Sequence, residues 1–514
     1  MTEKSSDSYS PLQSVSRGAS IFALGKGIDN GLRYFLTLLL THGLATPILF
    51  SVYAFATTIL AVINVFTNLG TNQSILKFVP QYEDNSGKRR RMLGLAYLTS
   101  LGAGIGGGAL LYVAAPWITQ FSTFTANGVG PYLTEGLRIL AIMLPFNTLT
   151  NCVKSLFKSL ELPEYQVLIE NILIPSLRVI MIGIALLLGY QLVGAITATV
   201  VGMLLVFAAA VWLAYTKASL SPLFSATRTE TVEFYNFSLP LTLNQAGYIL
   251  SNRVDILMVG FLVAAGDAVG MYKIATVLAG FLILPLNAFS QLFPPIASRL
   301  YTNGEIDNLE SLYRRVTRWS FTMALFPAVG AIVFSTELLT LFGDSYTQGQ
   351  LILLLFVVAQ LTNASVGPSG YLLMMTDHQY MTLTNQWILG LCNVVLNYFL
   401  IMEFGLIGAA IASVTVISSV NVLRVAEVWY FERLFPYSRK YLKPIFAGLV
   451  SAPLMYAVRA VFLEYLPPSV GRTVAALVVG TIGGVIGLVA FGAVLYWLGI
   501  EQEDRDFFAK HIPI

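Results

Sequence analysis

The sequence predicts an all-α, polytopic membrane protein with fourteen transmembrane helices, arranged as two parallel-repeated six-helix lobes followed by two C-terminal helices. Three observations support this fold class: the composition, the distribution of lysine and arginine, and an internal repeat. Of the 514 residues, 56% are hydrophobic and 11% are charged, whereas soluble domains are about 25% charged. The composition therefore indicates a chain that lies mostly within a membrane.

Each predicted transmembrane helix is a stretch of about 20 mostly apolar residues, the length that crosses the hydrocarbon core of a bilayer. Fourteen stretches meet this requirement, and the first, seventh and eighth contain ionisable residues. Their predicted limits are 18–41, 46–70, 92–114, 134–153, 164–188, 192–215, 237–262, 268–293, 317–338, 349–372, 382–402, 406–429, 444–463 and 473–498. An even number of helices places both termini on the same side.

Lysine and arginine are distributed asymmetrically about these helices. With the N-terminus in the cytoplasm, most of the 30 basic residues fall in predicted cytoplasmic segments or within helices, and Arg472 is the one left outside. Cytoplasmic loops of membrane proteins carry this excess of positive charge. The sequence therefore predicts that both termini are cytoplasmic. Cys152 and Cys392 both lie in predicted membrane helices, so we expect no disulfide framework.

An internal repeat divides the chain into two halves. Residues 53–57 (YAFAT) recur as residues 272–276 (YKIAT), and residues 192–195 (LVGA) recur as residues 406–409 (LIGA). Because six helices separate the two copies, both halves have the same orientation in the membrane. The predicted division is an N-terminal six-helix lobe (1–216), a cytoplasmic linker (217–236), a C-terminal six-helix lobe (237–430), and two additional transmembrane helices with a cytoplasmic tail (431–514).

The first predicted helix contains three charged residues within an otherwise apolar stretch. Lys26, Asp29 and Arg33 are three and seven residues apart, so they lie on one face of a helix. A charge at the centre of an isolated membrane helix costs about 2.5–3.5 kcal/mol. This face must therefore point towards other helices or a water-filled cavity.

Equivalent helices in the two halves carry further polar residues, as expected for a polar cavity lined by both halves. The alternative is a set of interhelical hydrogen bonds, worth about 0.6 kcal/mol each. The charged residues favour the cavity, whereas Glu170 with Arg178 is interpreted as a structural pair or as lying near an interface. The candidate cavity residues are Lys26, Asp29, Arg33, Tyr53, Asn68, Tyr248, Asn252, Arg253, Asp255, Tyr272, Lys273 and Asn287.

The sequence does not support an enzyme. Residues 102–107 match GxGxxG but lie inside a predicted membrane helix, where small residues allow close helix packing. Gly480, Gly483, Gly484 and Gly487 are interpreted in the same way. The longest predicted outer loop, 115–133, contains no charged residue and no histidine, and glycosyl transfer needs carboxylates or histidines. We expect no cofactor and no metal site.

Several short motifs resemble those of a known family. They are residues 44–54 (LATPILFSVYA), 77–82 (KFVPQY), 255–261 (DILMVGF) and 341–346 (LFGDSY). In this order and within fourteen helices, the sequence resembles the polysaccharide biosynthesis or oligosaccharide flippase family (Wzx-type) of the multidrug/oligosaccharidyl-lipid/polysaccharide exporter superfamily. It departs from the family at Ala45-Thr46-Pro47, where Gly-Pro is frequent, so the geometry of the first turn is left open.

The resemblance implies a transporter that flips a lipid-linked oligosaccharide from the inner to the outer leaflet of the plasma membrane by alternating access. The cargo would be a polyprenyl phosphate or diphosphate sugar for cell-surface polysaccharide or glycoprotein synthesis, and glycosyltransferases or a polymerase of the same pathway are expected partners. The expected headgroup ligands are Lys26, Arg33 and Lys273, together with Arg253. Tyr53, Tyr248 and Tyr272 are expected to contact sugar, with Asn68, Asn252 and Asn287 as further substrate-binding residues. Asp29 and Asp255 would bind a coupling proton or Na⁺, or pair with the basic residues.

Two alternatives remain open at this point. The first is a cation-coupled multidrug antiporter of the same superfamily, whose cavity should be acidic or aromatic and whose frame has twelve helices. The second is a membrane scaffold for glycosylation enzymes that transports nothing. A scaffold would tolerate neutral replacement of Lys26 and Arg33, whereas a flippase would not.

Overall fold

The computed structural model describes residues 11–499 apart from residue 219 and residues 466–470. All regular structure in this part of the chain is helical, which confirms the predicted all-α class. The chain divides into two compact units. Unit 1 is Met1–Lys273 with Gln386–Ala409, and unit 2 is Ile274–Asn385 with Ala410–Ile514. Because these units are defined by packing, the predicted division into repeated lobes stays a prediction.

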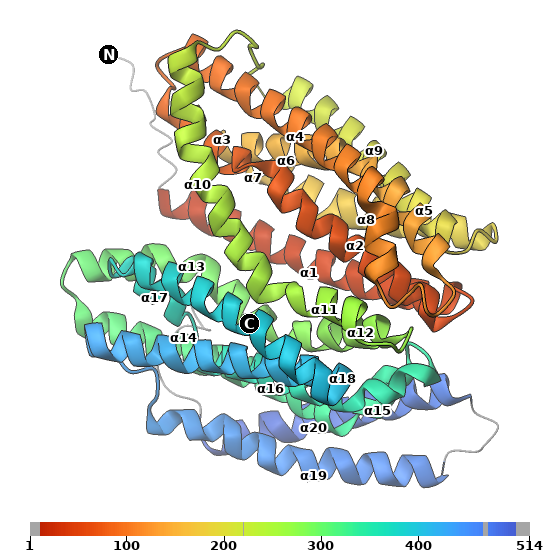
Figure 1. Cartoon of the computed structure of the whole chain (residues 1–514). Helices are drawn as coiled ribbons and strands as arrows, with labels where there is room; N and C mark the ends of the chain where they lie inside the picture. The colour runs from red at the N-terminus through yellow and green to blue at the C-terminus, as the bar shows by residue number, and fades with distance from the viewer. Residues whose placement is uncertain (1–10, 219, 466–470, 500–514) are drawn as a thin grey trace, which may run out of the picture. The chain divides into compact units, whose positions relative to one another are not determined.

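Unit 1 is built from the first eleven α-helices, the beginning of α12 and part of α18 (Figure 1). A π-helical turn, Leu168–Leu173, joins α7 to α8. The α-helices are α1 (Pro11–Gly43), α2 (Pro47–Asn68), α3 (Thr71–Gln81), α4 (Ser86–Phe121), α5 (Gly130–Ala141), α6 (Met143–Ser159), α7 (Pro163–Val167), α8 (Ile174–Leu187), α9 (Leu192–Lys217), α10 (Arg228–Asn252), α11 (Val254–Leu262) and α12 (Ala268–Gly280).

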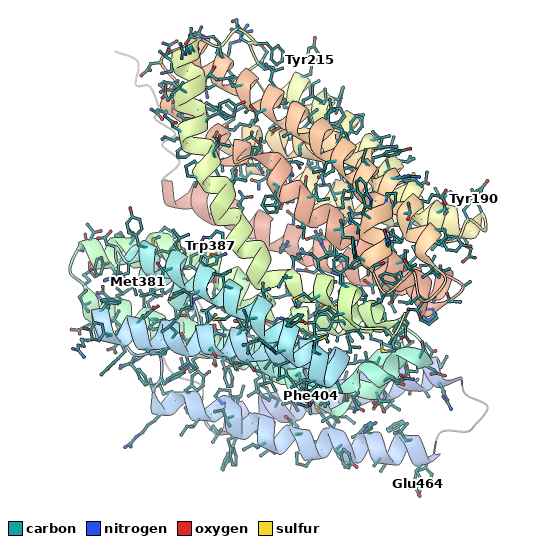
Figure 2. The ribbon with its side chains drawn as sticks, viewed as in Figure 1. Tyr190, Tyr215, Met381, Trp387, Phe404 and Glu464 are labelled. Atoms are coloured by element: carbon teal, nitrogen blue, oxygen red, sulfur yellow. The ribbon has the colours of Figure 1, made fainter. Side chains whose placement is uncertain are left out.

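Unit 2 begins within α12 and contains the remaining helices, apart from the Gln386–Ala409 part of α18. These are α13 (Leu284–Thr302), α14 (Ile306–Val333), α15 (Ser335–Thr340), α16 (Gln350–Val366), α17 (Ser369–Met375), α18 (Gln379–Glu432), α19 (Leu442–Tyr465) and α20 (Arg472–Trp497). The 54-residue α18 is interrupted at Gly405, whose φ of 57° and ψ of −133° are not helical. This backbone conformation is accessible to glycine and strained for other residues. Phe404, beside the interruption, is exposed (Figure 2).

Among the described residues, ten helices are long and apolar enough to cross a membrane, or eleven if the bent pair α5–α6 is one span. Two predicted spans, 382–402 and 406–429, are counted once in this total, because both fall within the stretch Tyr380–Glu432. The non-helical backbone at Gly405 lies between them. The first predicted span carries three charges, and the seventh is broken into α10 and α11. The total of fourteen spans therefore stays a prediction.

Exposed aromatic residues mark the ends of α9. Tyr190 precedes the helix and Tyr215 lies in its last turn, and the residues are 62% and 88% exposed (Figure 2). With a rise of 1.5 Å per residue, the two are about 37 Å apart along the helix. Tyrosine is enriched at both membrane–water interfaces. This spacing matches a helix that crosses the hydrocarbon core and ends in the two headgroup regions.

The last two helices, α19 and α20, lie side by side, and α19 also packs on α14 within unit 2 (Figure 1). Gly487 faces Met455 of α19 and Gly483 faces the ring of Phe334, as the small-residue interpretation predicts. Gly480 and Gly484 face open space, so the interpretation is wrong for these two. A partly buried ion pair anchors α19, since Arg459 Nε lies 2.7 Å from Glu337 Oε1.

The first turns of α10 and the segment before it are held against the start of α4 within unit 1. Arg91 Nη2 lies 2.8 Å from Glu230 Oε1, and Lys88 Nζ lies 2.9 Å from Glu233 Oε2. Arg90 donates to Ser221 at 3.0 and 2.8 Å. The hydrogen bond from Arg91 lowers the pKa of the Glu230 carboxyl to about 2, which makes this contact sensitive to acid.

We expect Arg91→Gln to lower the thermal midpoint of the detergent-solubilised protein near neutral pH. The folded pKa of Glu230 is depressed, so its contribution to stability is fully present above the unfolded value of about 4.3. It is lost as the pH falls towards the folded value of about 2. The deficit of the variant relative to the parent protein should therefore shrink through this window.

Arg90→Gln is the matched control for this experiment, because Arg90 bonds to the uncharged Ser221. Its deficit should stay constant between neutral pH and about pH 3, since no carboxyl group titrates in this contact. Identical pH profiles for the two variants would contradict the assignment of acid sensitivity to Glu230.

Candidate functional site

Three charged residues of α1 form a linked group. Lys26 Nζ lies 3.0 Å from Asp29 Oδ2, and Arg33 Nε lies 2.6 Å from Asp29 Oδ1. The three share one face of the helix, as their spacing predicts. The Asp29 side chain is 1% exposed, whereas the side chains of Lys26 and Arg33 are 37% and 56% exposed. The carboxylate is thus buried beneath two basic groups that are accessible.

α1 packs against α7, α8 and the π-helical turn between them. Gly25 allows this approach, because an added Cβ would lie 3.2 Å from Asn171 Cβ and would overlap the side chain of Val167. Turns of this π-helical kind are frequent at functional sites. The packing brings α8 beside the charged face of α1.

Arg178 of α8 belongs to the same region. It lies close enough to Asp29, Arg33 and Tyr53 to interact with them electrostatically. The interpretation of Glu170 and Arg178 as a structural pair is wrong, because Glu170 Oε2 instead lies 3.6 Å from Lys154 Nζ. Eight residues separate positions 170 and 178, which is about 12 Å along a helix and too far for a direct contact.

The break between α10 and α11 contributes a second part of the site. Arg253 occupies the break with a non-helical φ of −137° and ψ of −16°. Asp255 follows it, with Oδ1 accepting a hydrogen bond from the Ile256 backbone N–H at 2.8 Å and Oδ2 accepting one from the Tyr272 hydroxyl at 2.7 Å. Lys273 lies within electrostatic range of Arg253, Arg33 and Asp255. Broken membrane helices place charged groups near ion and substrate sites in transporters.

These residues make up one charged group within unit 1, here called the cationic cluster. Arg33 connects its two parts, since it is near both Arg178 and Lys273. Five basic and two acidic side chains give the cluster a formal charge of +3. Its members are Lys26, Asp29, Arg33, Arg178, Arg253, Asp255 and Lys273. Such a group suits an anionic ligand, because lysine and arginine donate charge-assisted hydrogen bonds to phosphate.

The two described candidate tyrosines have their hydroxyls engaged inside unit 1. Tyr53 is 5% exposed and its hydroxyl lies 3.0 Å from Thr199 Oγ1 of α9. Tyr272 is 0% exposed and donates to Asp255. A direct sugar contact through either hydroxyl would require the surrounding helices to open, so this role stays a prediction.

The candidate amides are placed elsewhere. Asn68 ends α2, about 22 Å along the helix from Tyr53, and accepts a hydrogen bond from Asn151 Nδ2 at 3.3 Å. Asn287 is exposed on α13 in unit 2. The side chains of Tyr248 and Asn252 lie outside the described residues. The structure therefore brings the charged candidates together, and the substrate role of the amides stays a prediction.

Arg178 is the member of the cluster that the sequence interpretation misplaced. It is the one charged side chain between residues 171 and 188, in a stretch that is otherwise strongly apolar. A charge in such a stretch is costly and is generally functional. The position of Arg178 in an otherwise apolar stretch therefore favours a functional residue over a structural pair within the same helix.

Helices long and apolar enough to cross a membrane, with a charged cluster among them, define a helical membrane protein. The chain belongs to the polysaccharide biosynthesis protein family, whose model matches residues 15–299. A curated relative is the probable flippase AglR of Haloferax volcanii, which is 25% identical over 288 residues. This match covers 55% of the present chain and 57% of the relative, so it spans little more than half the length of either protein.

Solved structures share the fold. The lipid II flippase MurJ, in an inward closed conformation, superposes with a TM-score of 0.67 at 16% identity, covering 93% of this chain and all of that one. A multidrug resistance MATE family transporter of the MOP superfamily, in an inward-facing conformation, gives 0.62 at 15% identity and covers 79% and 94%. A MOP superfamily transporter from Pyrococcus furiosus gives 0.59 at 15% identity and covers 83% and 97%. At these identities the likeness establishes the fold.

We expect the double variant K26Q/R33Q to be less stable than the parent protein, because it removes both direct partners of the buried Asp29. Removing one partner of a fully buried pair costs about 3–5 kcal/mol. The loss should be smaller here, since both cations are partly exposed and Arg178 stays nearby. Thermal unfolding in detergent measures this difference.

The triple variant K26Q/D29N/R33Q tests the cause. It replaces the whole charged group by neutral amides, so the buried carboxylate is no longer left without its partners. We expect its thermal midpoint to recover most of the loss. A triple variant as unstable as the double variant would mean that the stability of α1 does not depend on compensating Asp29.

Proposed function

We propose that this protein flips a lipid-linked oligosaccharide from the inner to the outer leaflet of the plasma membrane by alternating access. The observation that carries the proposal is the cationic cluster, with its formal charge of +3 and its accessible Lys26 and Arg33. A polyprenyl phosphate or diphosphate headgroup is anionic and accepts several hydrogen bonds, which complements this cluster. Membership of the polysaccharide biosynthesis protein family supports a sugar cargo, and the likeness to the probable flippase AglR supports flipping.

Arg33, Lys26 and Lys273 are the proposed headgroup ligands, with Arg253 and Arg178 adding positive charge around them. Asp29 takes the Nε–H of Arg33 at 2.6 Å. A guanidinium has four further N–H donors, so a phosphate can bind Arg33 while Asp29 keeps it in place. Asp29 thus acts as a positioning residue in the empty site and competes with the phosphate for the same cations. Competition of this kind favours release of the headgroup after it has crossed the membrane.

The two acidic residues are also the proposed sites for a coupling ion. A proton or Na⁺ on Asp29 would weaken its hold on Lys26 and Arg33 and raise the affinity for phosphate. Asp255 is the corresponding group at the break between α10 and α11, where it accepts hydrogen bonds from Tyr272 and from the backbone. At either carboxylate, binding of the ion would change the net charge of the cationic cluster and thereby its affinity for the substrate.

Export of organic cations is the second candidate, because the MATE family fold is shared at a TM-score of 0.62. The sign of the cationic cluster argues against it, since a formal charge of +3 repels a cationic substrate. Neutral replacement of the basic residues should improve the binding of an organic cation and weaken that of a phosphate. The same replacement should change nothing if the protein is a scaffold for glycosylation enzymes.

The proposal includes the orientation of the chain in the membrane and its partner enzymes. Both termini are proposed to lie in the cytoplasm, following the excess of basic residues on that side of the predicted spans. Glycosyltransferases that assemble the lipid-linked sugar, or a polymerase that uses it, are the proposed partners. No chemistry on the cargo is assigned to this chain.

Arg33→Gln and Lys273→Gln are each expected to slow flipping of a fluorescent polyprenyl-diphosphate sugar in proteoliposomes by at least tenfold. Each variant removes a charge-assisted hydrogen bond worth about 1.5–3 kcal/mol, and 1.4 kcal/mol corresponds to a factor of ten. Arg33→Lys should retain part of the activity because it keeps the charge. The readout is the fraction of labelled lipid accessible to a membrane-impermeant quencher over time.

Arg299→Gln is the matched control, because Arg299 is an exposed arginine of unit 2 outside the cationic cluster. Its flipping rate should equal that of the parent protein. Thermal midpoints of all variants exclude loss of folding as the cause. Parent-like flipping by both Arg33→Gln and Lys273→Gln would overturn the assignment of the headgroup to this cluster.

A further inference from the structure

Unit 2 contains a second concentration of basic residues, at the start of α14. A polar cavity of about 220 Å³ lies between the first turns of this helix and the segment that leads into α19. We call it the basic pocket. Its lining residues are Asp307, Glu310, Ser311, Arg314, Arg315, Arg318, Ser438 and Lys440.

The helical register of α14 explains why its basic residues gather here. Arg314, Arg315 and Arg318 are one to four residues apart, so they occupy neighbouring positions on one side of the helix. Lys440 approaches from the short 3₁₀ turn Arg439–Tyr441, which precedes α19. Two elements far apart in sequence thus direct basic residues to one cavity.

Two of the charged lining residues, Arg314 and Glu310, have a structural role. Arg314 Nη2 lies 2.7 Å from Glu310 Oε1, and Arg314 Nε donates to the Phe435 carbonyl at 3.0 Å. This pair holds the segment before α19 against α14. The lining residues together include four basic and two acidic side chains, a formal excess of two positive charges.

The pocket lies where α14 changes from polar to apolar. Residues 306–318 include most of the charged residues of this helix, and the residues from Phe321 onwards are predominantly apolar. Arg318, at the boundary, is 8% exposed. Trp319 follows directly, and tryptophan is enriched at the membrane–water interface. The pocket is therefore at the depth of lipid headgroups on the side predicted to be cytoplasmic.

We propose that the basic pocket binds the phosphate of an anionic membrane lipid. Basic pockets between transmembrane helices on the cytoplasmic side recognise such headgroups. Arginine and lysine supply charge-assisted hydrogen bonds to phosphate, and Ser311 and Ser438 supply hydroxyl donors. A bound lipid ties the segment 433–441 to α14, so it stabilises the connection between α18 and α19. The proposal is independent of the cargo assigned to the cationic cluster.

The test uses the full-length protein in phosphatidylcholine nanodiscs with and without phosphatidylglycerol. We expect phosphatidylglycerol to raise the thermal midpoint in proportion to the logarithm of its concentration, as for a ligand of the folded state. Native mass spectrometry of the released protein should show retained phosphatidylglycerol. The variant R315Q/K440Q should bind this lipid at least tenfold more weakly and lose the rise in midpoint. Arg318 is left unchanged because it is buried.

The matched control is K217Q/R299Q, which removes the same charge at one exposed lysine and one exposed arginine outside the pocket. Its response to phosphatidylglycerol should equal that of the parent protein. An equal loss in both double variants would mean a general surface attraction and would overturn the proposal. If inorganic phosphate alone, in phosphatidylcholine nanodiscs, gave the same stabilisation, the ligand would be a free phosphate and not a lipid.

The chain itself offers a competing anionic group. Lys443 Nζ donates to the Gly499 carbonyl at 2.8 Å, and the sequence continues with Glu501, Glu503 and Asp504. The variant E501Q/E503Q/D504N separates the two occupants. Phosphatidylglycerol should stabilise this variant as it does the parent protein. Lipid binding that appeared only after this neutralisation would identify the acidic stretch as the occupant and overturn the proposal.

Discussion

The buried carboxylate of Asp29 is the constraint on which the arrangement of the first helix depends. A charge within a membrane helix is tolerated when it is paired and turned away from lipid. Asp29 achieves this with Lys26 on one side and Arg33 on the other, at 3.0 and 2.6 Å. Because the carboxylate is 1% exposed, this face of α1 lies against the rest of unit 1. The contact with α8 then brings Arg178 close to the group. The basic residues here outnumber what is needed to compensate Asp29, and the site carries excess positive charge.

Departures from regular helix occur where polar groups are needed. In lipid, every backbone N–H and C=O requires a partner, so irregular backbone is confined to positions inside the protein or beside water. At the break between α10 and α11, Asp255 accepts the Ile256 N–H that the helix leaves unsatisfied. The other carboxylate oxygen receives the Tyr272 hydroxyl. The break is thus stabilised by the same carboxylate that lies beside Lys273.

The sequence was sufficient for the fold class and for the charged face of α1, because both follow from local periodicity and composition. Hydropathy identified where the apolar helices lie, and the spacing of Lys26, Asp29 and Arg33 placed them on one face. Their association with Arg178 was not predictable, since it depends on how two helices separated by more than 100 residues pack. The interruption at Arg253 is also not predictable from hydropathy. A hydropathy average covers about 19 residues and is insensitive to a single non-helical residue.

The same limit explains the candidates that the structure did not bring to the cluster. Asn68 shares a helix face with Tyr53 by periodicity, but periodicity carries no information about depth, and 15 residues separate the two along α2. Asn287 follows Asn68 by 219 residues, the same separation that relates Tyr272 to Tyr53 in the internal repeat, so its depth is not predicted by the repeat either. Charge is a stronger guide than periodicity here, because the cost of burying an unpaired charge selects the few positions where partners exist.

The two basic regions differ in a way that suits different phosphate ligands. In the cationic cluster, Asp29 and Asp255 offset part of the positive charge from within the bundle, so an anionic ligand gains less on binding and is released more readily. A transported headgroup needs this balance, since a site that binds too tightly cannot turn over. In the basic pocket, Glu310 pairs with Arg314 at 2.7 Å and holds the chain before α19 against α14. The pocket also lies where α14 changes from polar to apolar, at the proposed depth of the lipid headgroups, where ordinary lipids exchange freely. A resident lipid that is held rather than moved fits such a site, whereas a substrate in transit fits the cluster.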